Sequence, residues 1–545
     1  MKTNPRIIAL ALLSLVYVVW ASAFIYRSSF IGIDGVRYFS LFDDAMISMR
    51  YAWHLSHGYG LVWNIGERVE GFTNPLWTLW MSLGTWIFDK RIAVLFIHIS
   101  GVFIMLGIAS LTYAIATRLA HERDPSGNSW APLIAFILVL LYYPLSFWTL
   151  MGMETGLLSF LLLASVLIVL RSGHDFKISG LLLAIFCLAI LTRPDALIYV
   201  VLILSHRFYV LLFSKNLTQQ HIKTFNTYRL VAIEVVLLVL IVALPVVLRW
   251  FYYGELVPNT YTLKMTGMPV IDRLANGIGF IAPFFITIIP IIIFLMFNIR
   301  LLKTRNNILL LGLVITSISY QVWVGGDPWT YWRTMAPVMP LLFILCIEAM
   351  FNIAHHRTKS GSLNSRPARY VTIIFGGSLL VYVFANYKML SEQYLIKPAY
   401  NSDASQSFVN VAIATNEILI KDATLAVFAS GALPYFANFK AIDILGKSDK
   451  RIAHLPPDMS GAIAWSGMKS VPGHNKYDLR YSIVDLKPTY VQNFKIGRDD
   501  FTEYAHQNYA RVHYKEVGLW LLADSKDVLW DKIKNYEHRP IMSLH

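Results

Sequence analysis

The segment LFDDAMISMRYAWHLSHGYGLVWNIGERVEGFTNPLW, residues 41–77, places two adjacent acids and a run of polar residues directly behind the first apolar segment of the chain. That apolar segment, residues 7–25, follows Lys2 and Arg6, lacks a small-residue cleavage site and precedes many further apolar segments. We therefore expect a retained membrane anchor and not a signal peptide. Strongly charged residues this close to a bilayer are typical of a functional site.

The composition is that of a polytopic α-helical membrane protein. The 545 residues are 56% hydrophobic and 15% charged, and the mean hydropathy is +0.52. A chain of this kind spends most of its length in membrane helices and not in a large soluble core.

Apolar runs long enough to cross a bilayer predict about 11 membrane spans. Besides residues 7–25, they are residues 92–118, 131–149, 155–171, 177–193, 195–213, 229–250, 275–298, 307–324, 335–354 and 370–389. Basic residues gather in every second loop, which places the N-terminus in the cytoplasm by the positive-inside rule. These loops carry Arg118, Arg123, Arg171, Lys177, Arg207, Lys215, Lys223, Arg229, Arg300, Lys303, Arg305, Arg357, Lys359, Arg366 and Arg369.

Membrane orientation therefore accounts for the net charge of +14, and no nucleic-acid partner is expected. The predicted location is the bacterial inner (cytoplasmic) membrane. Residues 75–88 are apolar and contain Trp77, Trp80 and Trp86, but counting them as a span would invert every later loop. We place them on the outer interface, where indole rings are favoured, and a short true span remains the alternative.

The chain changes character near residue 391, so two domains are predicted. Residues 1–390 form the transmembrane domain, with a first outer loop at 26–91, and residues 391–545 form a periplasmic α/β domain. Within the latter, residues 424–446 read as strand, helix and strand, and residues 518–524 as a further strand. The two cysteines, Cys187 and Cys346, lie in different spans, so no disulfide framework is expected.

With this topology, every unusual polar cluster falls on the outer face of the membrane. Charges at the ends of spans gather around a shared polar cavity or around one another, because burial of a lone charge is costly. The candidates are Asp43, Asp44, Glu67, Arg68, Glu70 and Asn74 in the first outer loop, Glu154, Arg193, Asp195, Lys264, Asp327 and Arg333 in later outer segments, and His474 in the outer domain.

Each cluster also has a purely structural interpretation. Asp43 or Asp44 could N-cap a helix over 45–56, Glu154 could cap the helix that follows it, Arg193 and Asp195 could form a local ion pair, and Asp327 could stabilise a turn. His54, His57 and His474 are more typical of surface histidines than of metal ligands, because no second ligand lies at a suitable spacing. The joint placement of the clusters on one face favours a functional site.

A lipid-phosphate sugar donor fits a site with few carboxylates and several cations. Phosphate leaves without protonation when Arg or Lys neutralises it, so one carboxylate suffices to deprotonate the acceptor hydroxyl. Direct displacement then inverts the anomeric centre. Either Asp43 or Asp44 could be this base, with Arg193, Lys264 and Arg333 as phosphate partners and Arg68 as a further candidate.

The order of motifs resembles a known superfamily. DDAMISMRYAWHLSHGYGLVWN, GERVEGFTNPLW, GMET, LTRPDAL, YYGELVPNTYTLK, GGDPW, IDILGKSD and PGHNKYD follow one another along the chain. This order is similar to that of the GT-C superfamily of polyprenyl-phosphate-sugar-dependent glycosyltransferases. Within it, the chain is most similar to mycobacterial terminal arabinofuranosyltransferases and their relatives that arabinosylate pilin.

The resemblance implies an inverting transfer of a sugar, with arabinofuranose expected, from a polyprenyl phosphate to a cell-envelope glycan or an exported protein. It favours Asp43 as the base, with Asp44 positioning the sugar or exchanging that role. It also implies that Arg193 and Arg333 meet the donor phosphate, with Lys264 and Arg68 next. Sugar or acceptor contacts are expected from Glu67, Glu70, Asn74, Glu154, Asp195, Asp327 and His474.

No cofactor is predicted. Some relatives use a divalent metal, but too few acids converge here to indicate one. Met46 stands where relatives commonly have an aromatic residue, so the sugar contacts are expected to differ. The alternative function is a flippase or transporter of lipid-linked sugars, which would need charged sites at mid-span and access from both faces. A structural membrane protein with a carbohydrate-binding domain would leave the acids of the first loop unexplained.

Overall fold

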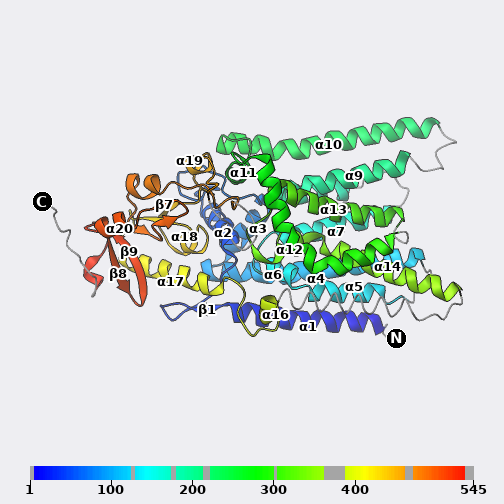
Figure 1. Ribbon diagram of the computed structural model, residues 1–545, viewed down its shortest axis with the longest axis horizontal. Coiled ribbons are helices and arrows are strands. Elements are labelled where there is room, and N and C mark those ends of the chain that lie inside the picture. Colours follow the sequence, from blue (N-terminus) through cyan, green and yellow to red (C-terminus); the bar gives the residue numbers. More distant parts are fainter. Residues whose placement is uncertain are drawn as a thin grey trace.

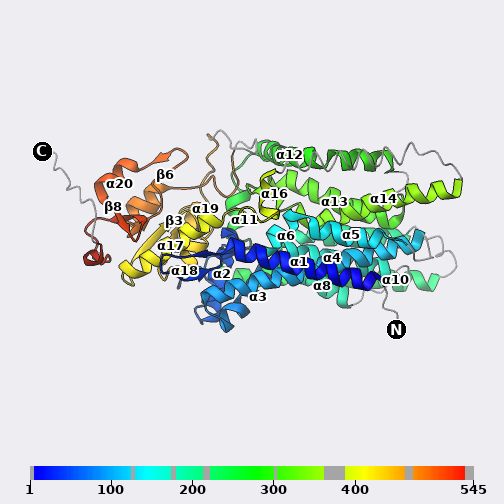
Figure 2. The ribbon, with the colours of Figure 1, turned by 90° about the horizontal axis from the view of Figure 1, so that it is seen from below.

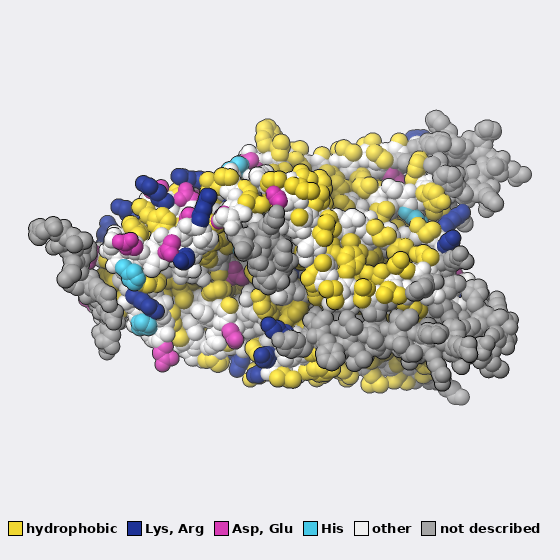
Figure 3. Space-filling view, in the orientation of Figure 1, with side chains coloured by type: hydrophobic (Ala, Val, Ile, Leu, Met, Phe, Trp, Pro, Cys, Tyr) yellow, Lys and Arg dark blue, Asp and Glu magenta, His cyan; other side chains and the backbone are white. Residues whose placement is uncertain are grey.

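The computed structural model describes residues 5–123, 129–172, 180–212, 221–299, 303–360, 387–460 and 470–533. Figure 1 shows an elongated molecule in which long helices run side by side towards one end and an α/β unit occupies the other. On the face seen in Figure 3, hydrophobic side chains cover much of the helical part, while charged side chains gather on the α/β end. This distribution is that of a membrane protein with a polar domain at one end.

Six helices are long and apolar enough to cross a membrane, or seven if one bent pair is a single span. The six are α1 (Pro5–Ser28), α4 (Lys90–Arg123), α7 (Thr155–Ser172), α10 (His221–Tyr253), α12 (Val270–Phe297) and α13 (Arg305–Val324). Further helices lie beside them: α5 (Ala131–Leu141), α6 (Tyr143–Leu150), α8 (Gly180–Thr192), α9 (Leu197–Leu212) and α14 (Met339–Ser360). The polytopic helical architecture expected from the sequence is confirmed, and the predicted span 370–389 falls mostly outside the described residues.

One predicted span has a different shape. Residues 131–149 were expected to form a single helix, but α5 and α6 meet at an angle of 55°. The bend lies at Tyr142, whose backbone is extended, and Pro144 occupies the first turn of α6. Proline has no N–H to bond to the preceding turn and restricts the residues before it, which explains the break.

Two helices fill the region between the long helices and the α/β unit. They are α2 (Asp43–Ser56) and α3 (Pro75–Ile87), joined by residues 57–74. Helix α3 buries Trp77 but leaves Trp80 and Trp86 exposed by 42% and 73%. Exposed indoles on a short apolar helix fit the predicted place on the membrane interface, which stays a prediction.

The polar end contains a five-stranded sheet in the order β4-β3-β5-β9-β8, in which β3 is parallel to β4 and β5, and β9 is antiparallel to β5 and β8. The mixed α/β class expected from the sequence is confirmed. Its elements are α16 (Tyr387–Gln393), α17 (Ser402–Ile418), β3 (Thr424–Val427), α18 (Ala432–Phe436), β4 (Lys440–Asp443), α19 (Lys450–Ala453), β5 (Tyr490–Val491), β6 (Lys495–Ile496), β7 (Asp499–Asp500), α20 (Thr502–Asn508), β8 (Tyr509–Tyr514) and β9 (Val517–Leu522). The hairpin β1 (Phe30–Ile31) and β2 (Arg37–Tyr38) and the short α11 (Asn259–Met265) complete the described elements.

Helix α2 binds both ends of α18, which fixes the α/β unit against the helical part (Figure 2). The carboxylate of Asp43 accepts hydrogen bonds from the amide of Gly431 at 3.2 Å and from that of Ala432 at 2.9 Å, where α18 begins. The guanidinium of Arg50 donates to the carbonyl of Pro434 in the last turn of α18 and to that of Phe439, which lies beyond its end. An anion at the amides and a cation at the carbonyls both match the partial charges of helix ends.

One interpretation of the sequence expected Asp43 to N-cap its own helix, but Asp43 does not do so. Residue Phe42 is the N-cap of α2 and makes no side-chain capping bond. Burial raises the pKa of Asp43 to about 6, although the amide of Ala432 acts in the opposite direction.

The close contact between α18 and α2 predicts that one methyl group added at Gly431 destabilises the protein. In Gly431→Ala the added Cβ would overlap the backbone oxygen of Asp43, whereas in Gly180→Ala it would meet open space. We expect Gly431→Ala to lower the free energy of unfolding by about 1–3 kcal/mol, as overpacking does. Melting temperatures of purified protein and protease susceptibility of residues 398–533 measure this. Equal melting temperatures for the two variants would contradict the tight contact.

The arrangement of helices also predicts sidedness. The N-terminal end of α1 lies far from the α/β unit (Figure 1), and the loops with the polar motifs lie near that unit. In a variant without Cys187 and Cys346, we expect Tyr59→Cys and Lys421→Cys to react with an impermeant thiol reagent on intact cells. Lys303→Cys should react only after permeabilisation. All three positions are exposed, and the reverse pattern would show an inverted orientation.

Candidate active site

Asp44 lies at the centre of a group of cations. Its Oδ2 accepts a hydrogen bond from Arg333 Nη1 at 2.9 Å and from Trp329 Nε1 at 3.0 Å. Its Oδ1 accepts from Lys447 Nζ at 2.8 Å. Burial opposes ionisation of this carboxyl, but Lys447, Arg333 and Lys264 hold its pKa well below the usual range. Asp44 is therefore ionised and firmly held in the free protein.

Lys447 reaches Asp44 from the α/β unit because of the loop after β4. Asp443, the last residue of β4, accepts hydrogen bonds from the hydroxyl of Ser430 and the amide of Ser448, both at 2.7 Å. Gly446 turns the chain with φ of +73°, a conformation that glycine adopts readily. The side-chain amide of Asn259 donates to the carbonyls of Gly446 and Lys447, both at 2.9 Å. The loop is thus held from both domains.

Arg333 comes from the segment between α13 and α14. Gly325 and Gly326, with φ of +87° and +81°, end α13 and turn the chain. Arg333 Nη2 donates to Asp327 Oδ1 at 2.7 Å. The guanidinium therefore bridges Asp327 and Asp44, and Asp327 does more than stabilise a turn.

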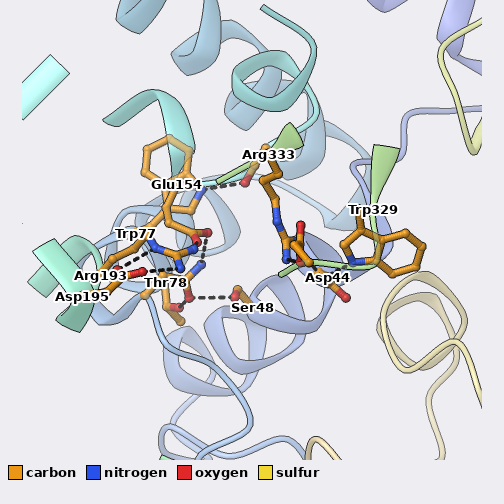
Figure 4. A network of polar contacts seen from close by, with 12 residues as sticks. Asp44, Ser48, Trp77, Thr78, Glu154, Arg193, Asp195, Trp329 and Arg333 are labelled. Carbon is orange, nitrogen blue, oxygen red and sulfur yellow. Dashed lines mark hydrogen bonds and ion pairs between the residues drawn. The ribbon is translucent and has the colours of Figure 1, made fainter. Parts of the chain in front are cut away.

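A second polar group faces the first across the site (Figure 4). Arg193 forms two hydrogen bonds with the carboxylate of Asp195, at 2.9 and 2.8 Å, and one with Glu154 Oε1 at 2.7 Å. Glu154 Oε2 accepts from the amide of Asn74 at 2.9 Å, and the oxygen of that amide accepts from Ser48 Oγ at 2.9 Å. The local pair of Arg193 and Asp195 is confirmed, and Glu154 joins it.

The two groups line one cavity of about 400 Å³. Its wall contains eight of the residues expected from the sequence: Asp44, Asn74, Glu154, Arg193, Asp195, Lys264, Asp327 and Arg333. The lining residues that are most exposed, Pro194, Tyr261 and Trp323, mark its open side. The structure therefore brings together motifs from six separate segments of the chain.

Lys264 differs from the other cations of the wall. Arg193, Arg333 and Lys447 each contact at least one carboxylate. The side-chain ammonium of Lys264 has neither a hydrogen bond nor an ion pair with a described residue. Burial and the nearby Arg333 lower the pKa of Lys264. An anion that enters the cavity would therefore find in Lys264 a cation that need not first leave a partner.

Other expected residues lie outside the cavity wall. Asp43 contacts α18, as described above, and Glu70 is paired with Arg249. Glu67 accepts from Asn64 at 2.9 Å and pairs with Lys440. The guanidinium of Arg68 lies 4.8 Å from the ring centre of Tyr252. These contacts give the four residues structural partners outside the cavity wall.

His474 lies beside the site and not on the open surface. Its ring stacks edge-on against Trp329, with ring centres 5.5 Å apart. Burial and the charge of Lys447 lower its pKa to about 3, so the imidazole is neutral. No group of three or more metal-ligating side chains is found among the described residues.

Some functional candidates were not identified from the sequence and become visible only in the structure. Lys447 and Trp329 contact Asp44 directly, and Ser48 bonds to Asn74 one turn after Asp44 on α2. A signal for Lys447 was present, because Gly-Lys-Ser follows a predicted strand in the motif IDILGKSD. Its direction towards the transmembrane domain was not visible in the sequence.

Known proteins resemble this chain mainly in structure. A family model described as Domain of unknown function (DUF8728) matches residues 398–533, and no curated protein matches the chain. A crystal structure of ArnT from Cupriavidus metallidurans bound to undecaprenyl phosphate is 14% identical, with a TM-score of 0.51, over 86% of this chain and 90% of that one. An oligosaccharyltransferase of Archaeoglobus fulgidus tethered with an acceptor peptide is 11% identical, with a TM-score of 0.49, over 98% of this chain and 75% of that one. The likeness to ArnT confirms the GT-C fold that the sequence motifs indicate.

Proposed function

We propose that the protein is an inverting glycosyltransferase that moves a sugar from a polyprenyl-phosphate donor to a cell-envelope glycan or an exported protein. Arabinofuranose is the sugar that the sequence motifs favour. The observation that carries the proposal is the cavity in which a carboxylate, Asp44, lies among three cations, one of which has no partner within the described part of the chain. Such a site can remove a proton and stabilise a phosphate leaving group at once.

The donor phosphate is assigned to Lys264, Lys447 and Arg333. All three act electrostatically on Asp44 and line the same cavity. Arg193 was a leading candidate from the sequence, but its guanidinium already binds Glu154 and Asp195. A guanidinium that is saturated by two carboxylates attracts a further anion weakly, so we assign Arg193 to the support of the sugar-binding wall.

The open side of the cavity suits the lipid. Pro194, Tyr261 and Trp323 surround it, and the last two are exposed by 50% and 51%. They belong to the break after α8, to α11 and to α13, at the level where the long helices end. A polyprenyl chain could lie along these apolar side chains while its phosphate enters the cavity. ArnT, which has the same fold, binds undecaprenyl phosphate.

Asp44 is proposed as the general base. Of the adjacent acids, Asp44 lines the cavity, while the carboxylate of Asp43 is bonded to Gly431 and Ala432. The acceptor oxygen forms a bond to the anomeric carbon as the bond from that carbon to the phosphate oxygen breaks. The phosphate keeps the bonding electron pair, and Asp44 takes the proton of the acceptor hydroxyl. Attack from the side opposite the phosphate inverts the anomeric centre.

The wall formed by Glu154, Asn74 and Ser48 is proposed to bind sugar hydroxyls. It stands opposite Arg333 across the cavity (Figure 4) and offers carboxylate, amide and hydroxyl groups. Hydrogen bonds from Arg193 and Asn74 fix the orientation of Glu154. Fixed acceptors and donors of this kind discriminate between sugars by the positions of their hydroxyls.

Purified protein incubated with several polyprenyl-phosphate sugars tests the proposal by release of the free lipid phosphate. We expect Asp44→Asn to lower this release by about a thousandfold or more, because the base is lost. Asp43→Asn should retain activity within about tenfold, because it affects docking of α18 and not the proton transfer. Full activity of Asp44→Asn together with loss in Asp43→Asn would reassign the base, and activity in both would exclude this mechanism.

Lys264→Met tests the phosphate site. Loss of one cation that stabilises developing charge typically lowers the rate by about 100 to 1000-fold. Lys450→Met is the matched control, because Lys450 is three residues from Lys447, has a half-buried side chain and pairs with Glu255 at 3.4 Å outside the cavity wall. The rate of lipid-phosphate release should fall in the first variant and stay within about twofold in the second. Equal rates in both variants would place the phosphate elsewhere.

A further inference from the structure

The segment that carries Trp329 and Arg333 has an unusual backbone. Tyr331 and Trp332 have φ of 59° and 43°, in the left-handed region. Two consecutive aromatic residues rarely adopt this conformation, because the Cβ atom approaches the backbone, and it persists only when the surroundings hold it in place. Along the chain, the strained pair lies between Trp329 and Arg333, both of which bond to Asp44.

Glu392 of α16 binds the strained pair directly. Its Oε1 accepts a hydrogen bond from the hydroxyl of Tyr331 at 2.5 Å. Its Oε2 accepts from the hydroxyl of Tyr143 at 2.6 Å and from the amide of Tyr400 at 3.0 Å. The carboxylate is 7% exposed, and burial raises its pKa. A buried acid whose hydrogen-bond donors are two phenols and one amide is costly to keep unless its geometry is needed.

The three partners of Glu392 come from different parts of the chain. Tyr143 begins α6, Tyr400 precedes α17 of the α/β unit, and Tyr331 belongs to the cavity segment. The ring of Tyr331 also packs edge-on against Phe147 and Tyr143, at 5.1 and 5.7 Å between ring centres. Glu392 therefore bonds both to the segment that leads into the α/β unit and to the segment that carries Trp329 and Arg333.

We infer that Glu392 is a positioning residue, which holds Tyr331 in its left-handed conformation and thereby keeps Trp329 and Arg333 against Asp44. The structural part of this inference stands on the geometry alone. Its kinetic consequence rests on the proposed function, because Asp44 is the base and Arg333 a phosphate partner only in that reaction.

Tyr331→Phe and Tyr143→Phe form a matched pair. Each variant removes one hydroxyl from the same carboxylate and keeps the ring, but only Tyr331 lies in the segment that contacts Asp44. We expect amide hydrogen exchange in residues 327–335 of the full-length protein to rise by about tenfold in Tyr331→Phe and in Glu392→Gln, as loss of a bond to a charged acceptor predicts. Exchange in Tyr143→Phe should stay within about twofold of wild type.

Transfer kinetics give the second readout. In Tyr331→Phe we expect kcat to fall by about tenfold while KM for the acceptor stays within about twofold, because Arg333 and Trp329 are displaced from the base Asp44 but the acceptor site is intact. Unchanged exchange in Tyr331→Phe would overturn the inference, as would an equal increase in Tyr143→Phe. If wild-type protein consumes no polyprenyl-phosphate sugar, the proposed function fails, and the exchange comparison still decides the role of Glu392.

Discussion

Two adjacent acids at the start of α2 point to different partners, and the remainder of the site depends on this division. Successive residues on a helix are turned by about 100°, so neighbouring side chains cannot share one environment. Asp43 binds the first amides of α18, and Asp44 binds Lys447, Arg333 and Trp329. The first interaction fixes the α/β unit on α2. The second interaction includes Lys447, which the docking of the α/β unit brings close to Asp44.

The cavity is therefore a product of both domains. Asn259 on α11 binds the loop after β4 from the side of the transmembrane helices, and Asp443 binds the same loop from within the sheet. Without either set of bonds Lys447 would have the freedom of a surface lysine, and freezing such a side chain costs free energy. The hydrogen-bonded loop after β4 removes that freedom before any ligand enters the cavity. Preorganised cations of this kind stabilise developing charge effectively.

The sequence predicted the helices, the strand pattern of residues 424–446 and the gathering of polar motifs, because hydrophobic periodicity and loop charge are local properties. It could not assign Asp43 and Asp44, since the choice depends on how α2 is rotated against α18. Arg193 ranked highly because of its place in the motif series, and the distant Glu154 that binds it was counted separately. Lys447 was missed for the same reason, since its partner lies about 400 residues earlier in the chain.

The pairing of charges suggests why the proposed reaction suits this cavity. A sugar phosphodiester carries one negative charge, and the released lipid phosphate carries a second when its bond to the sugar breaks. In the same step Asp44 gains a proton and loses its charge, so the total charge in the cavity stays constant. The negative charge moves from Asp44 to the phosphate, and Lys447 and Arg333 can follow it because they already contact Asp44. Lys264, without a partner among the described residues, provides the initial attraction for the donor, and the two paired cations become available to the phosphate only as the proton is transferred.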